Sequence, residues 1–440
     1  MDPSVFDAHA GDWSDAPRVR PGMVVMPRTP ADVARALGIL ASFGQSVVVQ
    51  GGLTGLAGGA TPQPGEVALS LSRLTAIEAF DRLGGTISVQ AGLALEQLQN
   101  AVEAEGWFFP LDLGARGTCQ IGGNAATNAG GNRVVRFGTM RELILGMEVA
   151  LPDGTVLSMM NKVTKNTTGI DLKQMFIGSE GVLGVITRLV LKLEPKPAAA
   201  NTALCALGSF DDATHLLKAL RVQLPGLSSF ELMWDGFMRA AMDIAALKAP
   251  FGDAYPVYVL VETLGDSAED DRLALERALE RALDAGLVQD VIVAQSIDHS
   301  RQLWAYRETV GELLSKLKPH AAFDVGVPMD AMDALVNRVH DTLGARFPAQ
   351  THLFFGHLGD GNLHLLSGPY ADADALLHVE EVVYQAVSEA GGCISAEHGI
   401  GVIKQSFLPL SRSDAELTLM KQLKSLLDPQ GILNANRVLI

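Results

Sequence analysis

Apolar and polar positions over residues 28–197 follow the spacings of short strands and short helices. The stretch 28–44 opens with Thr29, a good helix cap, and Pro30, which suits a first helical turn. Apolar runs at 46–50 and 86–92 predict strands, and 95–106 predicts a helix closed by Gly106. Two apolar runs in 143–160 flank Pro152-Asp153-Gly154 and predict a hairpin. We expect a first domain over 1–197.

The pattern changes after residue 197, where strand and helix segments alternate. The spacing predicts strands at 202–209, 228–236, 256–264, 291–296, 322–327, 351–357 and 363–367. It predicts helices at 211–223, 268–285, 301–316, 329–346 and 373–390. Rough alternation with some adjacent strands favours an antiparallel sheet covered by helices on one side. We expect a second domain over 198–427 and a short tail over 428–440.

Composition narrows the class of protein. A chain of 440 residues is too long for one core, and 48% apolar with 19% charged residues is typical of a globular fold. The net charge of −16 disfavours nucleic acid as a partner. Three scattered cysteines make no disulfide framework, and the first twenty residues lack the apolar core of a signal peptide. No apolar run is long enough for a membrane span, so we expect a cytoplasmic protein.

Two glycine-rich stretches, 51–62 and 114–131, offer free backbone N–H groups. Such loops bind phosphate or pyrophosphate, although a glycine-rich turn without a ligand is the plain alternative. There is no Walker lysine and no G-x-G-x-x-G opening a helix, which disfavours a nicotinamide site. The second stretch adds hydroxyl and amide side chains. Together the two stretches indicate a large polar cofactor held at both ends.

The stretch "FGHLGDGNLHL" (355–365) carries His357 and His364 on either side of a turn. A four-residue loop over 359–362 would set the two imidazoles opposite each other, close enough to share a divalent ion. Glu397 and His398 in "SAEHG" could add a carboxylate and a further imidazole, a donor set suited to Zn²⁺ or Mn²⁺. Packed or hydrogen-bonded histidines are the plain alternative, and the spacing alone does not establish a metal site.

Six motifs carry a resemblance to a known family. They are "GGLTGLAGGATP", "PLDLGARGTCQIGGNAATNAGG", "DLKQMFIGSEGVLGVIT", "GHLGDGNLHL", "SAEHGIG" and "DPQGILNANRVL", in this order from about residue 22 to 440. The chain resembles the FAD-linked D-2-hydroxyacid dehydrogenases, which are flavoproteins of the vanillyl-alcohol oxidase type. The resemblance implies an α+β fold with a two-part FAD-binding domain and an antiparallel-sheet cap domain, and a 428–440 tail that returns to the FAD domain.

The resemblance also implies a set of cofactor contacts. The pyrophosphate of FAD would lie on residues 51–55, and other contacts would follow along the second loop, the "GSEGVLGVI" stretch and the tail. The implied residues are Gly51, Gly52, Leu53, Thr54, Gly55, Thr118, Gly122, Gly123, Asn124, Thr127, Gly181, Gly184, Ile186 and Asn434. Relatives with covalent FAD have a histidine at the position of Leu53, so non-covalent FAD is expected.

The remaining motifs match the family's catalytic positions. By resemblance His357, His364 and Glu397 hold a divalent metal. His398 would take the substrate's hydroxyl proton while flavin N5 takes the hydride, and a 2-hydroxy acid becomes a 2-oxo acid. Arg307, on a predicted helix, would grip the substrate carboxylate as a fork, although an exposed helix arginine is the plain alternative.

Three positions depart from the hydroxyglutarate-oxidising members of the family. Gly311, Ala322 and Leu366 stand where those members have polar substrate contacts. We therefore expect a less polar pocket and a monocarboxylate substrate. Alternatives are a flavin oxidase, a flavin-dependent transferase such as the alkyl-glycerone phosphate synthases, a non-catalytic FAD-binding electron-transfer subunit, and a plain metallohydrolase. The electron acceptor (quinone, cytochrome or electron-transfer flavoprotein), the metal and a homodimer are left open by the sequence.

Overall fold

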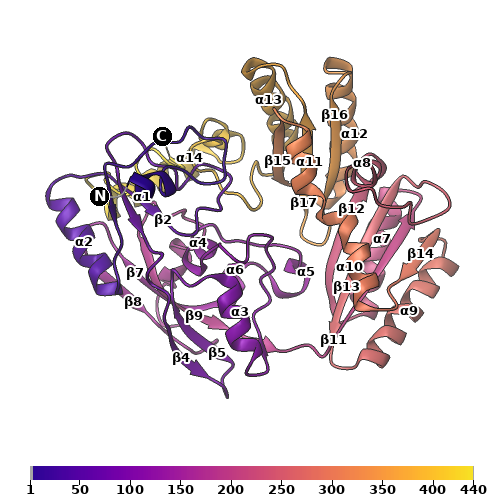
Figure 1. The fold of residues 1–440 in the computed structure, drawn as a ribbon, viewed down its shortest axis with the longest axis horizontal. Helices are drawn as coiled ribbons and strands as arrows, with labels where there is room; N and C mark the ends of the chain where they lie inside the picture. Colours follow the sequence, from indigo (N-terminus) through magenta and orange to yellow (C-terminus); the bar gives the residue numbers. More distant parts are fainter. Residues whose placement is uncertain (1–2, 440) are drawn as a thin grey trace. The chain divides into compact units, whose positions relative to one another are not determined.

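The computed structural model describes residues 3–439, and the chain divides into two compact units (Figure 1). The first unit comprises Met1–Gly131, Phe137–Lys196 and Glu397–Ile440, and the second comprises Asn132–Arg136 and Pro197–Ala396. The chain passes from the first unit to the second at residues 196–197 and returns at Glu397. The expected functional domains 1–197 and 198–427 and the tail 428–440 stay predictions.

The first unit contains two main sheets. Strands β1 (Met23–Val25), β3 (Val67–Ser70) and β2 (Val47–Gln50) form a parallel sheet in the order β1-β3-β2. An antiparallel sheet has the order β4-β5-β9-β7-β8, with β4 Ile77–Asp81, β5 Thr86–Gln90, β9 Val185–Lys192, β7 Ile144–Ala150 and β8 Val156–Met159. Strands β6 (Trp107–Phe108) and β10 (Glu194–Pro195) form a separate pair. This two-sheet arrangement agrees with the two-part domain implied by the resemblance.

One apolar core joins both sheets and the helices of the first unit. It contains Leu37 of α2 (Pro30–Ser42), Leu69 of β3, Leu98 of α3 (Leu95–Glu103) and Met147 of β7, all fully buried. The remaining helices of this unit are α1 (Pro3–Ala8), α4 (Ile121–Ala126), α6 (Met140–Leu143), η1 (Leu172–Met175), η2 (Gln405–Leu410) and α14 (Asp414–Leu427). The sheets are therefore parts of one packed body.

Local sequence signals account for several of these elements. The Thr29 side chain accepts a hydrogen bond from the Asp32 N–H, so the predicted cap of α2 is confirmed. The predicted 143–160 hairpin is confirmed as β7 and β8, and its turn has Gly154 at φ +88°, a backbone region that favours glycine. The expected loop over 114–131 is wrong in part, because residues 121–126 form α4. Hydrogen bonds to residues outside it stabilise this short helix: Ile121 N–H donates to Leu93 O and Gly122 N–H to Ala91 O.

Side-chain bonds explain the return of the chain to the first unit. The carboxylate of Glu180 accepts hydrogen bonds from the N–H groups of Ile400 (2.7 Å) and Gly401 (2.8 Å). Lys424 of α14 donates through Nζ to the carbonyl oxygen of Val182. These bonds join residues more than 200 positions apart, and no local sequence pattern announces them.

The second unit is built on one antiparallel sheet of seven strands. Its order is β14-β11-β13-β12-β16-β17-β15. The strands are β11 (Ala199–Leu207), β12 (Leu227–Trp234), β13 (Val257–Gly265), β14 (Asp290–Val293), β15 (Ala321–Gly326), β16 (Thr351–His357) and β17 (Asn362–Gly368). The predicted strands of this region and its antiparallel sheet are confirmed.

Helices cover both faces of this sheet, so the expectation of helices on one side is wrong. On β16, Phe354 packs against His340 of α12, while the next residue, Phe355, packs against Phe237 of α8. Strand β13 is buried along nearly its whole length, as expected for a strand covered on both faces. The helices of this unit are α7 (Phe210–Gln223), α8 (Asp235–Ala245), α9 (Ala268–Asp284), α10 (Ile297–Glu308), α11 (Val310–Lys316), α12 (Met329–Arg346) and α13 (Ala373–Glu389). Helix α5 (Val134–Phe137) belongs to this unit up to Arg136. The sequence did not predict α8, and it predicted α10 and α11 as one helix.

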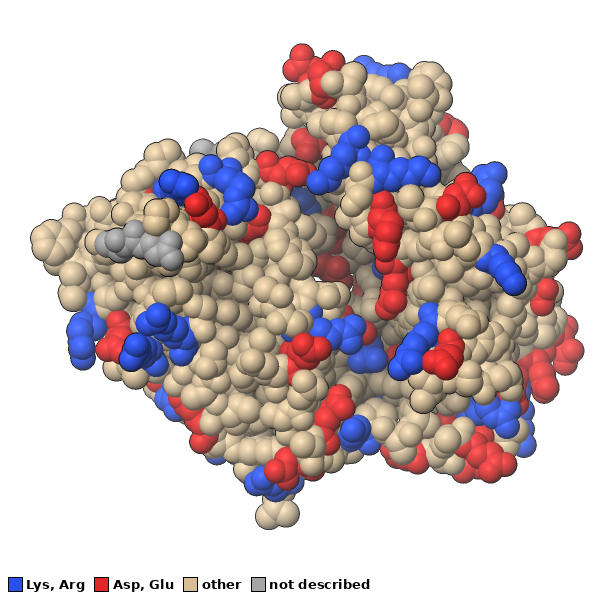
Figure 2. Space-filling view, viewed as in Figure 1, with Lys and Arg blue, Asp and Glu red and all other residues tan. Residues whose placement is uncertain are grey.

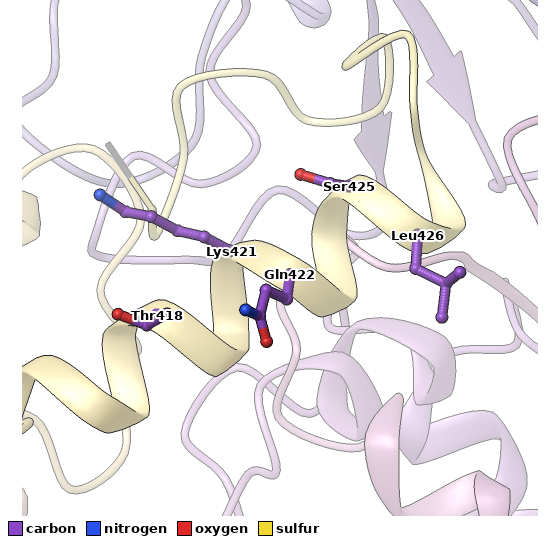
Figure 3. A pocket seen from close by; sticks show the side chains of 5 residues that line it. All are labelled: Thr418, Lys421, Gln422, Ser425 and Leu426. Carbon is purple, nitrogen blue, oxygen red and sulfur yellow. The ribbon is translucent and has the colours of Figure 1, made fainter.

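The surface carries mixed charge on the face in Figure 2, where Lys and Arg side chains are interspersed with Asp and Glu. Helix α14 has no buried residue, and a surface hollow on it is lined by Thr418, Lys421, Gln422, Ser425 and Leu426 (Figure 3). None of the site residues inferred from the sequence lines this hollow. Among residues 3–439, no helix combines the length and the apolar character needed to cross a bilayer.

Candidate functional site

The loop that follows β2 has the free backbone expected of an anion-binding nest. Within the described part of the chain, the N–H groups of residues 51–55 donate no hydrogen bond to another protein group. Leu53 adopts φ +57°, which bends the loop sharply. Five unpaired N–H groups in consecutive residues suit the oxygens of a pyrophosphate.

The second glycine stretch lies directly against this loop. A Cβ on Gly52 would stand 2.1 Å from the carbonyl oxygen of Thr118, so only glycine permits the approach. Gln120 Oε1 is buried without a hydrogen-bond partner among the described residues and lies 3.5 Å from the position of a Cβ on Gly51. A Cβ on Gly123 would meet no atom within 4 Å. An unsatisfied buried acceptor and open space beside free N–H groups fit a polar ligand between the two stretches.

The other inferred cofactor residues of this unit are engaged mainly with protein. Asn124 is buried, with its amide nitrogen 3.6 Å from Cys119 Sγ, and Thr127 donates to Gly123 O. The space beside Gly184 is filled by Val149, and Ile186 belongs to the core of the unit. Their part in cofactor binding stays a prediction.

Asn434 joins three segments of the first unit. Its Oδ1 accepts a hydrogen bond from Val49 N–H, and its Nδ2 donates to Glu180 O, both at 2.8 Å. A Cβ on Gly181 would lie 3.0 Å from the same Nδ2. Both ends of the Asn434 amide are thus used by the backbone next to the first glycine loop, and direct contact with a cofactor stays a prediction.

The two histidines of the β16–β17 hairpin lie side by side, but in a register different from the expected one. His357 of β16 pairs with Asn362, and His364 of β17 pairs with Phe355, so the two histidines are diagonal neighbours and not directly opposite. The loop spans residues 358–361 because Gly361 takes the position at φ +79°, which favours glycine. The imidazole centroids are 5.4 Å apart. The predicted direct pairing of His357 with His364 is wrong, because the loop is displaced by one residue from the expected 359–362. Both rings still lie on the same face of the sheet.

A carboxylate joins this pair. One ligand atom each from His357, His364 and Glu397 lie within 4.8 Å of one another, a spacing that suits one shared divalent ion. Glu397 follows Ala396 directly, and the Ala396 N–H donates to Asp324 O on β15. A second such group consists of Asp324, Glu397 and His398. The residues inferred from the motifs therefore converge, and their donor set fits a hard or borderline cation.

Arg307 of α10 is buried, so the reading of an exposed helix arginine is wrong. Its Nε donates to Glu231 Oε2 at 2.9 Å, and its Nη2 lies 3.5 Å from His357 Nε2. Its guanidinium carbon stands 4.6 Å from the centroid of the Phe355 ring. With the Nε side bonded to Glu231, the end of the fork formed by Nη1 and Nη2 is the part that can meet a ligand.

Sequence reasoning missed Glu231, which is fully buried on β12. Its Oε1 lies 2.7 Å from His357 Nδ1. Burial would raise the pKa of this carboxyl, but its interactions with His357 and Arg307, hydrogen bonds included, outweigh burial and hold the pKa below its usual range. The available signal was one glutamate in the apolar strand "SFELMW", since a buried charge requires partners.

The three departing positions differ in their surroundings. Leu366 of β17 is buried in an apolar cluster with Tyr306, Leu353 and Phe355. A Cβ on Gly311 would meet nothing within 4 Å, and Ala322 is exposed. None of the three positions supplies a polar side chain.

Comparison with known proteins agrees with both halves of this arrangement. Residues 21–159 match the family model of an FAD binding domain, and residues 196–438 match that of the C-terminal domain of FAD linked oxidases. The mitochondrial D-2-hydroxyglutarate dehydrogenase of Bos taurus is 40% identical over 100% of this chain and 80% of its own length. A putative mitochondrial D-lactate dehydrogenase of Schizosaccharomyces pombe is 38% identical over 98% of this chain and 84% of its own. The D-2-hydroxyglutarate dehydrogenase of Xanthomonas citri pv. viticola is 37% identical over 99% and 93%.

A solved structure of alkyldihydroxyacetonephosphate synthase shares the fold. It superposes with a TM-score of 0.71 at 16% identity, covering 94% of this chain and 75% of the other. The prediction of a vanillyl-alcohol oxidase type α+β fold is confirmed by this likeness and by the family models.

The prediction of a cytoplasmic location is wrong by the same comparison, because relatives from cattle, rice and fission yeast are named as mitochondrial. The prediction rested on the absence of an apolar signal segment. That criterion detects secretory signals and does not detect the amphipathic segments that direct proteins to mitochondria.

Proposed function

The chain belongs to the FAD-linked oxidases and is an FAD-dependent D-2-hydroxyacid dehydrogenase. We propose that its oxidation of a D-2-hydroxy acid to the 2-oxo acid depends on a divalent metal and a histidine base. The proposed metal ligands are His357, His364 and Glu397, and the proposed base is His398. The convergence of these three ligands beside the buried Arg307 is the observation that carries the proposal.

Each side chain has a task that its chemistry suits. When bound, FAD accepts the hydride, and the metal lowers the pKa of the substrate hydroxyl. The Nη1/Nη2 end of Arg307 would bind the substrate carboxylate and fix the orientation of the reacting carbon. His398 would receive the hydroxyl proton, since a neutral imidazole is a good acceptor near physiological pH.

The first unit would bind FAD without a covalent bond. Residues 51–55 would hold the pyrophosphate through backbone N–H groups. The second glycine stretch would face the cofactor with Gln120 and with the open space beside Gly123. Leu53 has no nucleophilic atom, so it offers no covalent attachment at this position. Denaturation should release all of the flavin into the supernatant.

The substrate is proposed to be a monocarboxylate with an apolar side chain. The named relatives include D-2-hydroxyglutarate and D-lactate dehydrogenases, and a second carboxylate would need polar partners. Gly311, Ala322 and Leu366 provide none. A panel of D-2-hydroxy acids with a dye acceptor tests this point, and a strong preference for D-2-hydroxyglutarate would contradict it.

The decisive experiment measures metal content and turnover in two variants of the FAD-loaded protein. His357→Ala should lose both metal and turnover. His398→Ala should retain the metal and lose turnover by about 10²–10⁴-fold, the usual contribution of a general base. His215→Ala, a change at an exposed helix position, serves as the control and should keep both. Full activity in either site variant would remove the role assigned to that residue.

The same preparation separates the alternative functions. Oxygen uptake that matches substrate turnover would indicate an oxidase. A flavin that no hydroxy acid bleaches would indicate an electron-transfer subunit. Bleaching without oxygen uptake supports a dehydrogenase, which passes its electrons to another acceptor.

A further inference from the structure

We propose that Glu231 is a positioning residue that locks His357 and Arg307 into one buried unit and thereby sets the affinity of the metal site. This inference rests on the proposed metal ligands and goes beyond them, because Glu231 itself would touch neither metal nor substrate. It concerns residues of one sheet face of the second unit and one helix packed on it.

The contacts of Glu231 use both of its oxygens. Oε1 lies 2.7 Å from His357 Nδ1, and Oε2 accepts from Arg307 Nε at 2.9 Å. The side chain is completely buried, so water cannot replace either partner. In the sheet, Glu231 pairs directly with His357 across β12 and β16, which fixes the distance between the two side chains through the backbone.

The first consequence concerns the histidine ring. A carboxylate facing Nδ1 keeps the proton on that nitrogen, and the lone pair of a neutral ring is then on Nε2. One ring nitrogen of His357 lies within 4.8 Å of the ligand atoms of His364 and Glu397, and because Glu231 occupies Nδ1, that role falls to Nε2. Arg307 Nη2 is 3.5 Å from Nε2, at the limit of a hydrogen bond. Glu231 therefore selects the tautomer and the ring orientation that present Nε2 as a ligand.

The second consequence is electrostatic. The guanidinium of Arg307 stands close to a proposed metal ligand, and a fixed positive charge there disfavours a divalent cation. Glu231 supplies the compensating negative charge within hydrogen-bonding distance of that guanidinium. The net charge of the Glu231–Arg307 pair is close to zero, so the pair repels a metal ion little. Arg307, which would bind substrate, can therefore lie next to His357, which would bind the metal.

The third consequence is the direction of Arg307. Bonding at Nε leaves the Nη1/Nη2 end of the fork beside His357, and the Phe355 ring supports the flat guanidinium at 4.6 Å. The same ring stacks on His364 with centroids 4.9 Å apart. Glu231 and Phe355 thus hold the two histidines, on adjacent strands β16 and β17, against the arginine of α10.

The test measures the dissociation constant of Zn²⁺ or Mn²⁺ by competition with a chromophoric chelator, on FAD-loaded protein without substrate. Glu231→Gln keeps the shape and removes the charge, and metal binding should weaken about 10–100-fold, as is typical when the partner of a ligating histidine is lost. Glu262→Gln is the matched control. Glu262 is buried on the neighbouring strand β13 and bonds to Arg133, so its loss should leave the metal affinity within twofold.

A double-mutant cycle distinguishes positioning from a general loss of structure. If Glu231 acts through His357, Glu231→Gln should weaken metal binding in the parent and have no further effect in His357→Ala. Should Glu231→Gln fail to fold, Glu231→Asp, which keeps the charge but is one methylene too short to bridge both partners, replaces it. Parental affinity in a folded variant, or equal losses with and without His357, overturns the inference. A parent protein that binds no metal would instead refute the proposed function.

Discussion

The glycine loops of the first unit and the histidine-bearing face of the second place their polar groups by opposite means. The first loop offers backbone N–H groups, and its Gly52 matters because a Cβ there would meet the backbone of the second stretch. The sheet face offers side chains, and several of these are held by other side chains, as Glu231 holds His357 and Arg307. A backbone site should therefore fail through added atoms, and a side-chain site through removed charges or hydrogen bonds.

The largest expected effect comes from adding one carbon atom to the first region. Gly52→Ala places a Cβ about 2.1 Å from Thr118 O, so the two loops must separate. We expect loss of bound FAD and a decrease of about 3 kcal/mol or more in the free energy of unfolding, the upper range for overpacking. The flavin-to-protein absorbance ratio and a urea titration measure both. Gly114→Ala, in the second stretch but with open space around its Cβ, should change neither. A Gly52→Ala protein that binds FAD at the parental ratio would contradict the statement that added atoms disrupt the backbone site.

A smaller effect is expected from an exchange that preserves charge in the second region. Arg307→Lys keeps the positive charge and loses the Nε–H bond to Glu231 together with the planar fork. Charge-assisted hydrogen bonds contribute about 1.5–3 kcal/mol, so kcat/KM should fall about 10–100-fold. The control is Arg301→Lys on the same helix, whose ion pair with Asp298 is exposed. Equal activity in Arg307→Lys would mean that charge alone suffices there.

The smallest expected effect is a change in how stability depends on pH, caused by Glu180. Burial raises the pKa of this carboxyl above its ordinary value, although the Ile400 and Gly401 N–H groups oppose the shift. A raised pKa in the folded state means that the native protein keeps a proton that the unfolded chain has lost. Stability should therefore fall as pH rises from the ordinary glutamate range toward the raised value.

Glu180→Gln removes this titration, so the stability of the variant relative to the parent should increase with pH, by on the order of 1 kcal/mol. Urea titrations at several pH values measure the difference. Glu416→Gln is the opposite control: hydrogen bonding to Ser413 lowers the pKa of Glu416, so its contribution is lost as pH falls. Parallel curves for Glu180→Gln and the parent would show that this carboxyl does not titrate differently in the folded state.

Most elements of the fold could be read from local pattern. The Thr29 cap, the turn at Gly154 and the strands of the second unit follow from rules that act over a few residues. Helix α4 could not be read in this way, because two glycines weaken its propensity and contacts to Ala91 and Leu93 hold it. The break at Thr309 between α10 and α11 had no local signal either.

The sequence alone determined which residues are candidates for the chemistry, since glycine runs, paired histidines and a following glutamate are local features. Only the tertiary structure decided the register that makes His357 and His364 diagonal neighbours, the helices on both sheet faces, and the return of the chain at Glu397. It also decided the partnership of Glu231 with His357, 126 residues away. Local propensity depends on neighbours in sequence, whereas strand pairing and buried charge pairs depend on which distant segments the core brings together.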